Sequence, residues 1–454
     1  MEIASIPYKN INDGSKIFKP NYHLNYGKKR ITQALKKKKE FFPLKQCISA
    51  IFKGGFDKSY FIEDEQKAYK YISAQHLAKK LAIESGKLIS KKLTTNYDEM
   101  VLKNKQILIS CAGTIGNTRL IGNDLDGVLG SQDIIRIEAN ENEMPYGFLY
   151  AYLSSPTAYN YMQSFIYGSV VPRIDTFKLG TLPVPKMDKN LIKIVNDKII
   201  KSKELRESAY LKLKESHKIF DCLLFDEPKR PFYKTHTKSN LFKYQSRLDS
   251  CFNIEYEYYT SILFKKFGNI EKLGLFINDA FIPNRGKRLY TKKGLRYLST
   301  SDISTLNPSL INKNISLKTP GISSIPVKKD WILIARSGQE ILGSTFYVSK
   351  TLENLGVNEH ALRIVTDKKF SKYTYAYLSS KFGKKYLRSG IFGSAILTIN
   401  EDFVKELYIP IIEKEKEVEI INTIGLSIEE YDEADYLEKQ AIDLIEKEIE
   451  LWQK

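Results

Sequence analysis

The sequence predicts an α+β protein made of two copies of one β-rich fold, each followed by a long helix. Three observations predict this class: a segment that recurs at a constant distance, strand-like runs separated by glycine-rich turns, and two apolar-periodic stretches that each exceed 30 residues. The length of 454 residues is in keeping with two or three compact units.

The duplication is visible as identical letters at a fixed offset. Residues 150–155 (YAYLSS) recur as residues 375–380, which is 225 positions later. The same offset relates residues 107–109 to 332–334, Gly168 to Gly393, Ile174 to Ile399 and Pro185 to Pro410. An offset that is constant over more than 100 residues indicates a tandem duplication of one fold.

Each copy repeats one order of elements. Strand-like runs at residues 105–110 and 331–335 lie among Gly/Asn/Asp turn clusters. A short helix is predicted at residues 147–163 and again at 373–387, and a glycine-serine loop follows. A proline-bearing extended segment, at 182–185 or 407–410, then leads into a long helix.

The two long helices are predicted from apolar residues spaced three and four apart. They cover residues 190–221 and 414–452. Their similar lengths, 32 and 39 residues, and their equivalent positions predict an antiparallel coiled coil. Stretches of this length disfavour the alternative that each helix packs on its own domain. The predicted domains are residues 1–185 (first β-rich domain), 186–226 (first helix), 227–412 (second β-rich domain) and 413–454 (second helix). Residues 226–237 read as the linker between the copies.

The positive charge belongs to the two β-rich copies. Lys+Arg 71 against Asp+Glu 53 gives a net charge of +18. Residues 16–185 carry 25 basic and 15 acidic residues, and residues 229–412 carry 30 and 14, whereas residues 413–454 carry 5 and 14. A lysine-rich proteome would also raise the total, but it would not leave the last segment acidic. The distribution favours a polyanionic partner for each copy.

Cysteine usage and hydropathy predict a cytoplasmic protein. Cys47, Cys111, Cys222 and Cys251 are scattered, without a CxxC pair or flanking histidines, so they indicate neither zinc nor a disulfide framework. No apolar run approaches the roughly 20 residues that span a bilayer. The first 20 residues lack the charged-then-apolar layout of a signal peptide.

The complete layout resembles the specificity subunit of Type I restriction-modification systems. That family has two target-recognition domains, each followed by a long helical region, and the two helices form a coiled coil between the domains. The resemblance covers essentially the whole chain and rests on residues 107–116 (ILISCAGTIG), 130–134 (GSQDI), 168–175 (GSVVPRID) and 182–185, and on residues 246–249 (SRLD), 297–303 and the Gly393 loop of the second copy. Each piece is a weak motif, but their order and repetition are specific.

Base-reading residues are expected in the glycine-rich loops, since Arg suits guanine and Asn or Gln suits adenine. The two copies keep framework positions and differ in loop side chains, as two readers of unlike half-sites would, although drift after duplication would look the same. The candidates are Arg119, Gln132 and Arg173 in copy one and Arg285, Arg288, Arg336 and Gln339 in copy two. For each one alone, a solvated charge or a local structural bond is the competing interpretation, and Arg173 could hold its loop against Asp175.

No catalytic or metal-binding residues are predicted. The sequence contains no Walker-type loop, no HExxH, no Asn/Asp-Pro-Pro-aromatic motif and no recognisable histidine triad. The resemblance implies that catalysis comes from partners: two adenine-N6 methyltransferase subunits that use S-adenosylmethionine, and motor-nuclease subunits that use ATP and Mg²⁺. Leu437, Leu444 and Trp452 of the acidic last helix are a predicted partner surface, with coiled-coil core as the alternative and Trp452 as the strongest interface candidate.

Three other functions remain open on the sequence. A related recognition subunit could serve a system that cuts on both sides of its site. A self-contained nuclease or methyltransferase with eroded motifs would show activity as the purified chain. A non-enzymatic scaffold for RNA or protein would bind random duplex DNA without preference for a site.

Overall fold

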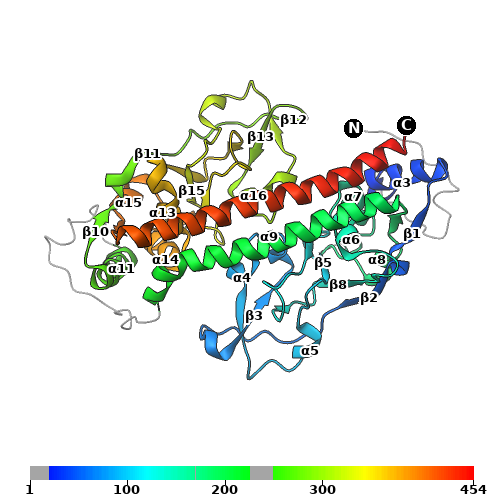
Figure 1. Cartoon of the computed structure of the whole chain (residues 1–454), viewed down its shortest axis with the longest axis horizontal. Coiled ribbons are helices and arrows are strands. Elements are labelled where there is room, and N and C mark those ends of the chain that lie inside the picture. The colour runs from blue at the N-terminus through cyan, green and yellow to red at the C-terminus, as the bar shows by residue number, and fades with distance from the viewer. Residues whose placement is uncertain (1–19, 169, 225–248) are drawn as a thin grey trace. The chain divides into compact units, whose positions relative to one another are not determined.

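The computed structural model describes residues 20–168, 170–224 and 249–454, and these form two compact units (Figure 1). Unit 1 consists of Met1–Glu207 with Glu433–Lys454, and unit 2 consists of Ser208–Asp432. Each unit therefore contains one β-rich domain and a part of both long helices. The predicted linker at residues 226–237 and residues 246–248 of the SRLD motif lie outside the described residues.

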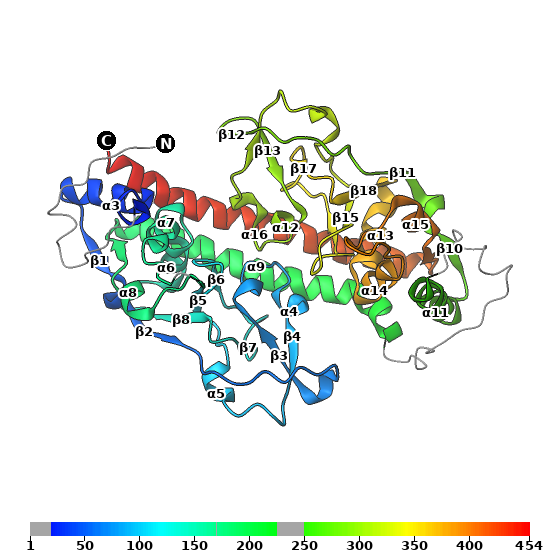
Figure 2. The ribbon, with the colours of Figure 1, turned by 180° about the vertical axis from the view of Figure 1, so that it is seen from behind.

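The β-rich domain of unit 1 is organised around a four-stranded antiparallel sheet in the order β2-β8-β5-β6 (Figure 2). A three-stranded sheet, β4-β3-β7, and the pair β1-β9 complete it. The strands are β1 (Phe41–Pro43), β2 (Ile48–Lys53), β3 (Ala68–Ile72), β4 (Lys87–Ser90), β5 (Ile107–Ser110), β6 (Thr118–Leu120), β7 (Leu129–Gly130), β8 (Ile134–Ala139) and β9 (Pro183–Pro185). The helices are α2 (Pro20–His23), α3 (Tyr26–Lys36), α4 (Ala82–Ser85), α5 (Tyr97–Met100), α6 (Tyr146–Leu153), α7 (Pro156–Gln163), α8 (Thr176–Gly180) and α9 (Lys189–Asp221).

Unit 2 repeats this topology, with sheets in the orders β11-β18-β15-β16 and β12-β14-β13-β17 and the pair β10-β19. Its strands are β10 (Ile270–Lys272), β11 (Ile277–Phe281), β12 (Tyr290–Thr291), β13 (Leu295–Leu298), β14 (Asn314–Ile315), β15 (Ile332–Ala335), β16 (Thr345–Tyr347), β17 (Gly356–Val357), β18 (Ala361–Thr366) and β19 (Tyr408–Pro410). Its helices are α11 (Ser250–Phe267), α12 (Thr300–Ile303), α13 (Lys368–Ser379), α14 (Lys381–Ser389), α15 (Glu401–Glu406) and α16 (Lys414–Leu451). The predicted α+β class and duplication are confirmed.

The identical YAYLSS segments are explained by two hydrogen bonds that each copy needs. The buried hydroxyl of Tyr152 donates to the carbonyl of Pro183, and that of Tyr377 donates to the carbonyl of Tyr408 at 2.8 Å. Each bond ties a helix to the proline-bearing strand before a long helix. The final serine of the segment caps the next helix: the Ser155 hydroxyl accepts the amide of Ala158, as Ser380 does for Gly383.

The long helices run antiparallel to each other within unit 1 (Figure 1). Lys198 of α9 donates to Gln440 of α16 at 2.7 Å, and Ser202, one turn later, donates to the carbonyl of Ala434 at 2.7 Å. In unit 2, Ser427 of α16 donates to the carbonyl of Ala209 at 2.7 Å. The repeat offset of 225 converts the first serine-alanine pair into the second, so the duplication extends into the helices. Small residues at these positions allow the backbones to approach closely.

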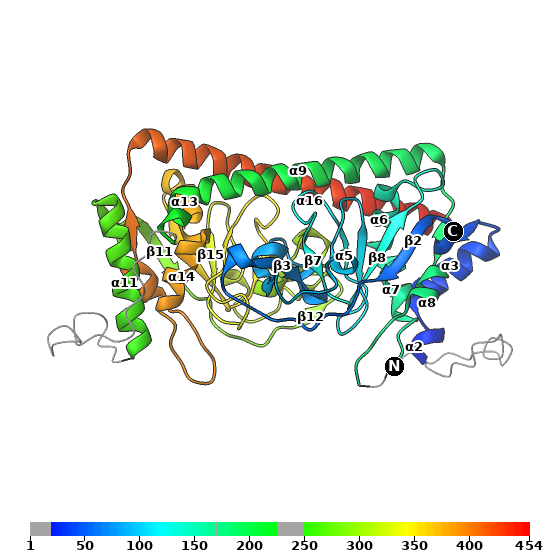
Figure 3. The same ribbon diagram turned by 90° about the horizontal axis from the view of Figure 1, so that it is seen from below.

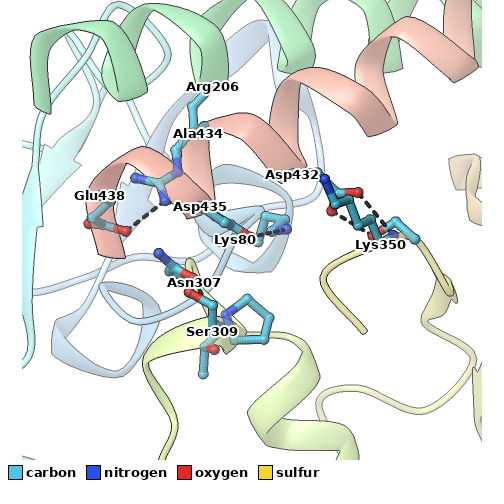
Figure 4. Close-up of polar contacts among 12 residues, drawn as sticks. Lys80, Arg206, Asn307, Ser309, Lys350, Asp432, Ala434, Asp435 and Glu438 are labelled. Carbon is cyan, nitrogen blue, oxygen red and sulfur yellow. Dashed lines mark hydrogen bonds and ion pairs between the residues drawn. The ribbon is translucent and has the colours of Figure 1, made fainter. Parts of the chain in front are cut away.

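A buried ion cluster fixes the register of the two helices in unit 1 (Figure 4). Arg206 of α9 lies 2.8 Å from Asp435 and 2.7 Å from Glu438 of α16. Lys80 lies 3.4 Å from Asp435, and the Tyr150 hydroxyl donates to Glu438. Burial raises the pKa of Asp435, with Lys80 and Arg206 opposing the shift. The cluster is satisfied only in this register, because each carboxylate meets its donors at one helical position.

Each β-rich domain is fastened to its own segment of helix by a carboxylate that receives a turn amide. In unit 1, Glu207 accepts the amide of Asn123 at 2.6 Å. In unit 2, Asp432 accepts the amide of Lys350 at 3.1 Å and the Ser349 hydroxyl at 2.6 Å (Figure 4). Glu207 and Asp432 are themselves 225 positions apart. The domain-to-helix joint is thus part of the duplicated unit.

Not all of the apolar residues that predicted the two long helices are buried. Val195, Ile199 and Ile445 are buried, as a packed helix face requires. Val418 and Leu451, two apolar residues of the predicted second helix at 414–452, are exposed. No helix within the described ranges has the length and apolarity that a membrane span requires.

Candidate nucleic-acid interface

Three loops of domain 1 converge on the backbone of Cys111, at the end of β5. The Cys111 amide donates to the carbonyl of Asp133 at 2.9 Å, which joins it to the turn before β8. The Cys111 carbonyl accepts the amide of Ile174 at 3.1 Å, which joins it to the loop before α8. Gln132 and Arg173 are both exposed on these joined loops. The structure therefore brings two of the three predicted residues of copy one to one surface.

Domain 2 builds the same convergence with a different side chain at its centre. Arg336 takes the place of Cys111: its amide donates to the carbonyl of His360 at 2.9 Å, and its carbonyl accepts the amide of Ile399 at 3.1 Å. The imidazole Nδ1 of His360 lies 2.6 Å from the hydroxyl of Ser337. Gln339 is exposed on the same loop. The framework hydrogen bonds are repeated, whereas the side chains they present are not.

The third loop is a hairpin whose closure requires glycine. Tyr167 and Arg173 exchange two backbone hydrogen bonds of 2.9 Å, and Phe392 and Thr398 exchange two of 3.0 and 2.9 Å. Gly168 and Gly393 adopt φ angles of +86° and +101°, where a Cβ would lie 2.6 and 2.4 Å from a carbonyl oxygen across the loop. In each unit the hairpin projects away from the long helices (Figure 3). Its tip carries exposed aliphatic side chains in both copies, among them Val171 and Ile396.

Arg119 does not lie on this surface. It is 4% exposed, and its guanidinium donates to the carbonyls of Leu77 and Lys79 and pairs with Asp124 at 3.5 Å. The sequence placed it in an exposed glycine-rich loop, but the residue belongs to strand β6, where its side chain turns toward the core. We therefore leave Arg119 out of the proposed interface. The alternative that Arg173 holds its loop against Asp175 has no support in the contacts of the described residues, in which that carboxylate caps α8 by accepting the amide of Lys178 at 2.7 Å.

Two arginines of copy two, Arg285 and Arg288, lie beside Glu359, in the turn that precedes β18. Arg288 is largely covered, with its guanidinium 3.1 Å from Glu359 and Nε donating to the Tyr297 hydroxyl at 3.1 Å. Arg285 is exposed, with its Nε 3.8 Å from the same carboxylate. Arg336 is half-buried and its Nε donates to the carbonyl of Ile399 at 3.4 Å. Arg285 is thus the freest of the three to contact a ligand, while Arg288 orders the segment before β12.

Sequence reasoning missed several basic residues that the fold places near these loops. Residues 284–293 contain five basic residues and no acidic one. The exposed basic residues that were missed there are Lys287, Lys292 and Lys293, and the aromatic Tyr290 beside them is also exposed. The local density of basic residues would have identified this segment. In domain 1, burial raises the pKa of the Cys111 thiol, and the positive charges of Lys53 and Arg173 oppose that rise. Lys53 therefore lies close to the converging loops, and no sequence signal distinguishes it from other lysines.

The predicted partner residues are less accessible than expected. Trp452 is 6% exposed, its ring makes an edge-to-face contact with Phe41 at 5.8 Å, and its Nε1 donates to Glu448 at 2.7 Å. Leu437 and Leu444 are half-buried. Because the indole belongs to the core of unit 1, Trp452 is not a free docking residue, and we retain only Leu437 and Leu444 as a proposed partner surface.

Truncating Trp452 tests this placement. Trp452→Ala should lower the stability of unit 1 by about 3–5 kcal/mol, since the variant leaves a cavity in its core. Hydrogen exchange of the backbone amides of unit 1 would measure the loss. The neighbouring Leu451 is 51% exposed, so Leu451→Ala should change stability by no more than about 0.5 kcal/mol. Equal, small effects of both variants would contradict the assignment of Trp452 to the core.

Within the part of the chain that the structure describes, no group of three His, Cys, Asp or Glu side chains is placed to hold a metal ion. Cys47 and Cys111 are buried and free of disulfides, and burial raises the pKa of both thiols, to about 11 for Cys47. Neither thiol is therefore disposed to act as a nucleophile near neutral pH. The features with functional character are the two sets of converging loops.

Comparison with known proteins assigns the first copy to a protein family. Residues 36–216 match the family described as the Type I restriction modification DNA specificity domain. The chain contains a Type I restriction-modification DNA specificity domain. The match spans the converging loops of domain 1 and most of α9, and it confirms the family that the motifs indicated. Domain 2 repeats the strand order of this specificity domain, so the chain contains its fold twice.

Solved structures of specificity subunits are similar to the chain at low sequence identity. The S subunit of a Type I restriction-modification system from M. genitalium is 14% identical, with 91% of this chain and 95% of that chain covered and a TM-score of 0.35. The HsdS subunit from Thermoanaerobacter tengcongensis is 15% identical, with 89% and 95% covered and a TM-score of 0.28. No curated protein matches the chain.

Proposed function

We propose that this chain chooses the DNA target of a Type I restriction-modification complex, and that each domain reads one half of a bipartite, gapped sequence. The observation that carries the proposal is the repeated loop framework with unlike side chains. Gln132 and Arg173 are presented in domain 1, and Arg285, Arg336 and Gln339 in domain 2. Two readers built on one framework would recognise different half-sites.

Electrostatics support duplex DNA as the ligand. The segments that contain the two domains carry net charges of +10 (25 against 15) and +16 (30 against 14). Basic side chains that neutralise phosphates release counterions, so such domains bind DNA with a strong dependence on salt. The residues we propose as phosphate contacts are Lys53, Lys287, Lys292 and Lys293. All four are exposed; Lys53 lies close to Cys111, and the other three belong to the basic segment that contains Arg285 and Arg288. Phosphate contacts would orient each domain, and the glutamine and arginine side chains would discriminate bases.

The catalytic chemistry is proposed to reside in partner subunits. Two modification subunits would methylate adenine N6 with S-adenosylmethionine, and motor-nuclease subunits that use ATP and Mg²⁺ would complete the restriction complex. The half-buried Leu437 and Leu444 on α16 are the proposed contact for a modification subunit. A recognition subunit for a system that cuts on both sides of its site would use the same surface, and the partner genes would distinguish it.

Mapping methylated adenine across the source genome, with and without this gene, tests the function. A two-part gapped motif that loses methylation on deletion is the expected result. Survival of every methylated motif would contradict the proposal. Binding of random duplex DNA by the purified chain, without preference for a site at physiological salt, would favour a general nucleic-acid scaffold.

Single substitutions should alter one half-site at a time. Gln132→Ala should relax discrimination at one base pair of one half-site by about 1–3 kcal/mol, and Gln339→Ala should do the same in the other half-site. Methylome sequencing of cells that carry each variant reads both halves at once. Gln66 is exposed in domain 1 outside the three loops, so Gln66→Ala is the control and should leave both half-sites unchanged. Relaxation of the same half-site by both loop variants would contradict the division of reading between domains.

A further inference from the structure

Each domain buries one arginine at an equivalent place in its main sheet. Arg136 of β8 lies opposite Leu108 of β5, and Arg363 of β18 lies opposite Leu333 of β15. Both side chains belong to residues that are 0% exposed. Their numbers differ by 227 rather than 225, so the constant repeat offset does not reveal them. Only the strand register identifies the pair.

The two guanidinium groups make the same set of hydrogen bonds to backbone carbonyls. Arg136 donates to Met100 at 2.9 Å, to Gly130 at 2.9 Å and to Ile134 at 3.2 Å. Arg363 repeats each bond at the equivalent position and adds one, with acceptors Ile325 at 3.4 Å, Val357 at 2.5 Å, Asn358 at 2.8 Å and Ala361. Among the described residues, neither guanidinium has a carboxylate partner within ion-pairing distance. The dipoles of the carbonyl groups therefore compensate the positive charge of each guanidinium.

The acceptors include both ends of the turn that precedes each strand. Gly130 and Ile134 bracket the turn that presents Gln132, and Val357 and Ala361 bracket the turn that presents Glu359. One planar cation thus spans the base of each turn and holds its two ends at a fixed separation. We propose that Arg136 and Arg363 are positioning residues for sequence reading, each of which sets the shape of the recognition turn in its own domain. This inference rests on the proposed function and deepens it.

Stability alone does not account for these arginines. Burial lowers the pKa of each guanidinium to about 10, so both remain protonated at neutral pH. A buried charge without an opposite charge is costly, and an apolar side chain of similar volume would usually stabilise a core more. The Nε of each arginine is also buried without a hydrogen-bond partner. The same costly arrangement is nevertheless present in both copies, beneath the loops whose geometry recognition depends on.

Gly54 packs against the guanidinium of Arg136 in domain 1. We call Arg136 and Arg363 the clamps of their domains, because each one spans the base of a turn. A Cβ at Gly54 would lie 2.3 Å from Nη1, 2.4 Å from Nη2 and 2.5 Å from Cζ of Arg136. The backbone of Gly54 therefore packs directly on the guanidinium, and a methyl group there would displace the clamp without removing its charge. Gly54→Ala is for this reason a second way to disturb the turn.

The test is a methylome comparison in cells that carry the complete restriction-modification system with this chain. Lysine keeps the charge but lacks the planar fork, so it cannot span the turn. Arg136→Lys should raise methylation of sites with one mismatch in a single half-site by about ten-fold, and Arg363→Lys should do so only for the opposite half-site. Gly54→Ala should reproduce the Arg136→Lys pattern. One chain reads both halves, so the unaffected half-site is an internal control for folding.

Arg296→Lys is the matched control. Its guanidinium also bonds only to carbonyls, those of Ile311, Pro308 and Ser309 at 2.9, 2.8 and 2.5 Å, but these lie outside the recognition turn. Arg296→Lys should lower the stability of unit 2 without weakening base discrimination in either half-site. The inference would be overturned if any clamp variant lowered methylation uniformly at all sites. It would also be overturned if Arg296→Lys weakened base discrimination as much as Arg363→Lys does. Absence of any gapped motif for the unaltered chain would instead refute the proposed function.

Discussion

Arg206→Met should lower the stability of unit 1 by about 3–5 kcal/mol, because the substitution leaves two buried carboxylates without their main partner. Arg206 contacts Asp435 at 2.8 Å and Glu438 at 2.7 Å, and both carboxylate side chains are almost completely covered. Lys80 is a second cation paired with Asp435, at 3.4 Å. It compensates for only part of the loss. Urea denaturation followed by circular dichroism would measure the change.

The pH dependence of this loss has a defined sign. Burial raises the pKa of Asp435 in the folded chain above its ordinary value. A carboxyl with a raised folded pKa contributes stability that is present below the unfolded pKa and is lost as pH rises through the folded pKa. Removal of Arg206 takes away an opposing positive charge, so the deficit of the variant should grow as the pH rises above the ordinary pKa of aspartate, which is about 4.

Neutral replacements provide the control for the ion cluster. Combining Arg206→Met with Asp435→Asn and Glu438→Gln removes every unpaired charge that Arg206→Met alone leaves behind, so it should recover much of the loss. Lys212→Met in unit 2 breaks a more exposed pair with Glu430, at 2.7 Å, and should cost no more than about 1 kcal/mol. A loss for Arg206→Met as small as that for Lys212→Met would show that the cluster does not fix the helix register.

Duplicating residues 201–207 in α9 together with residues 426–432 in α16 should lengthen the gap between the two recognised half-sites. The two segments are equivalent under the repeat, and each ends where the chain passes between units 1 and 2. Seven residues add about 10.5 Å to a helix at 1.5 Å per residue. At about 3.4 Å per base pair, the gap should grow by at least one and at most about three base pairs.

The half-sites themselves should not change, because the converging loops of both domains are untouched. Methylome sequencing would report gap length and half-sites together. Duplication in α9 alone is the matched control. It shifts α9 against α16 by seven residues, so the Ser202–Ala434 and Ser427–Ala209 hydrogen bonds can no longer form together. This variant should lose site-specific methylation. An unchanged gap in a functional double-duplication variant would contradict the proposal that helix length sets the spacing.

Much of the fold was predictable because it is written in short-range patterns. The repeat offset of 225 gave the duplication, and the three-four apolar spacing gave α9 and α16 to within a few residues. The loop framework around Cys111 and Arg336 was also implied, since the glycine-rich motifs are shared by both copies. The residues that function inside the framework were predicted less well. Arg119 resembles a loop arginine in sequence, yet strand β6 turns its side chain into the core.

The sequence by itself determined the duplication, the α+β class, the two long helices and the concentration of positive charge in the two domains. These properties depend on composition and on spacing along the chain, both of which can be read without contacts. Tertiary structure alone decided that Trp452 belongs to the core, that Glu359 pairs with Arg285 and Arg288, and that Arg136 and Arg363 occupy equivalent places. Each of these depends on strand register or on side chains far apart in the chain, and the physical reason is that burial and hydrogen bonding are properties of the packed state rather than of residue type.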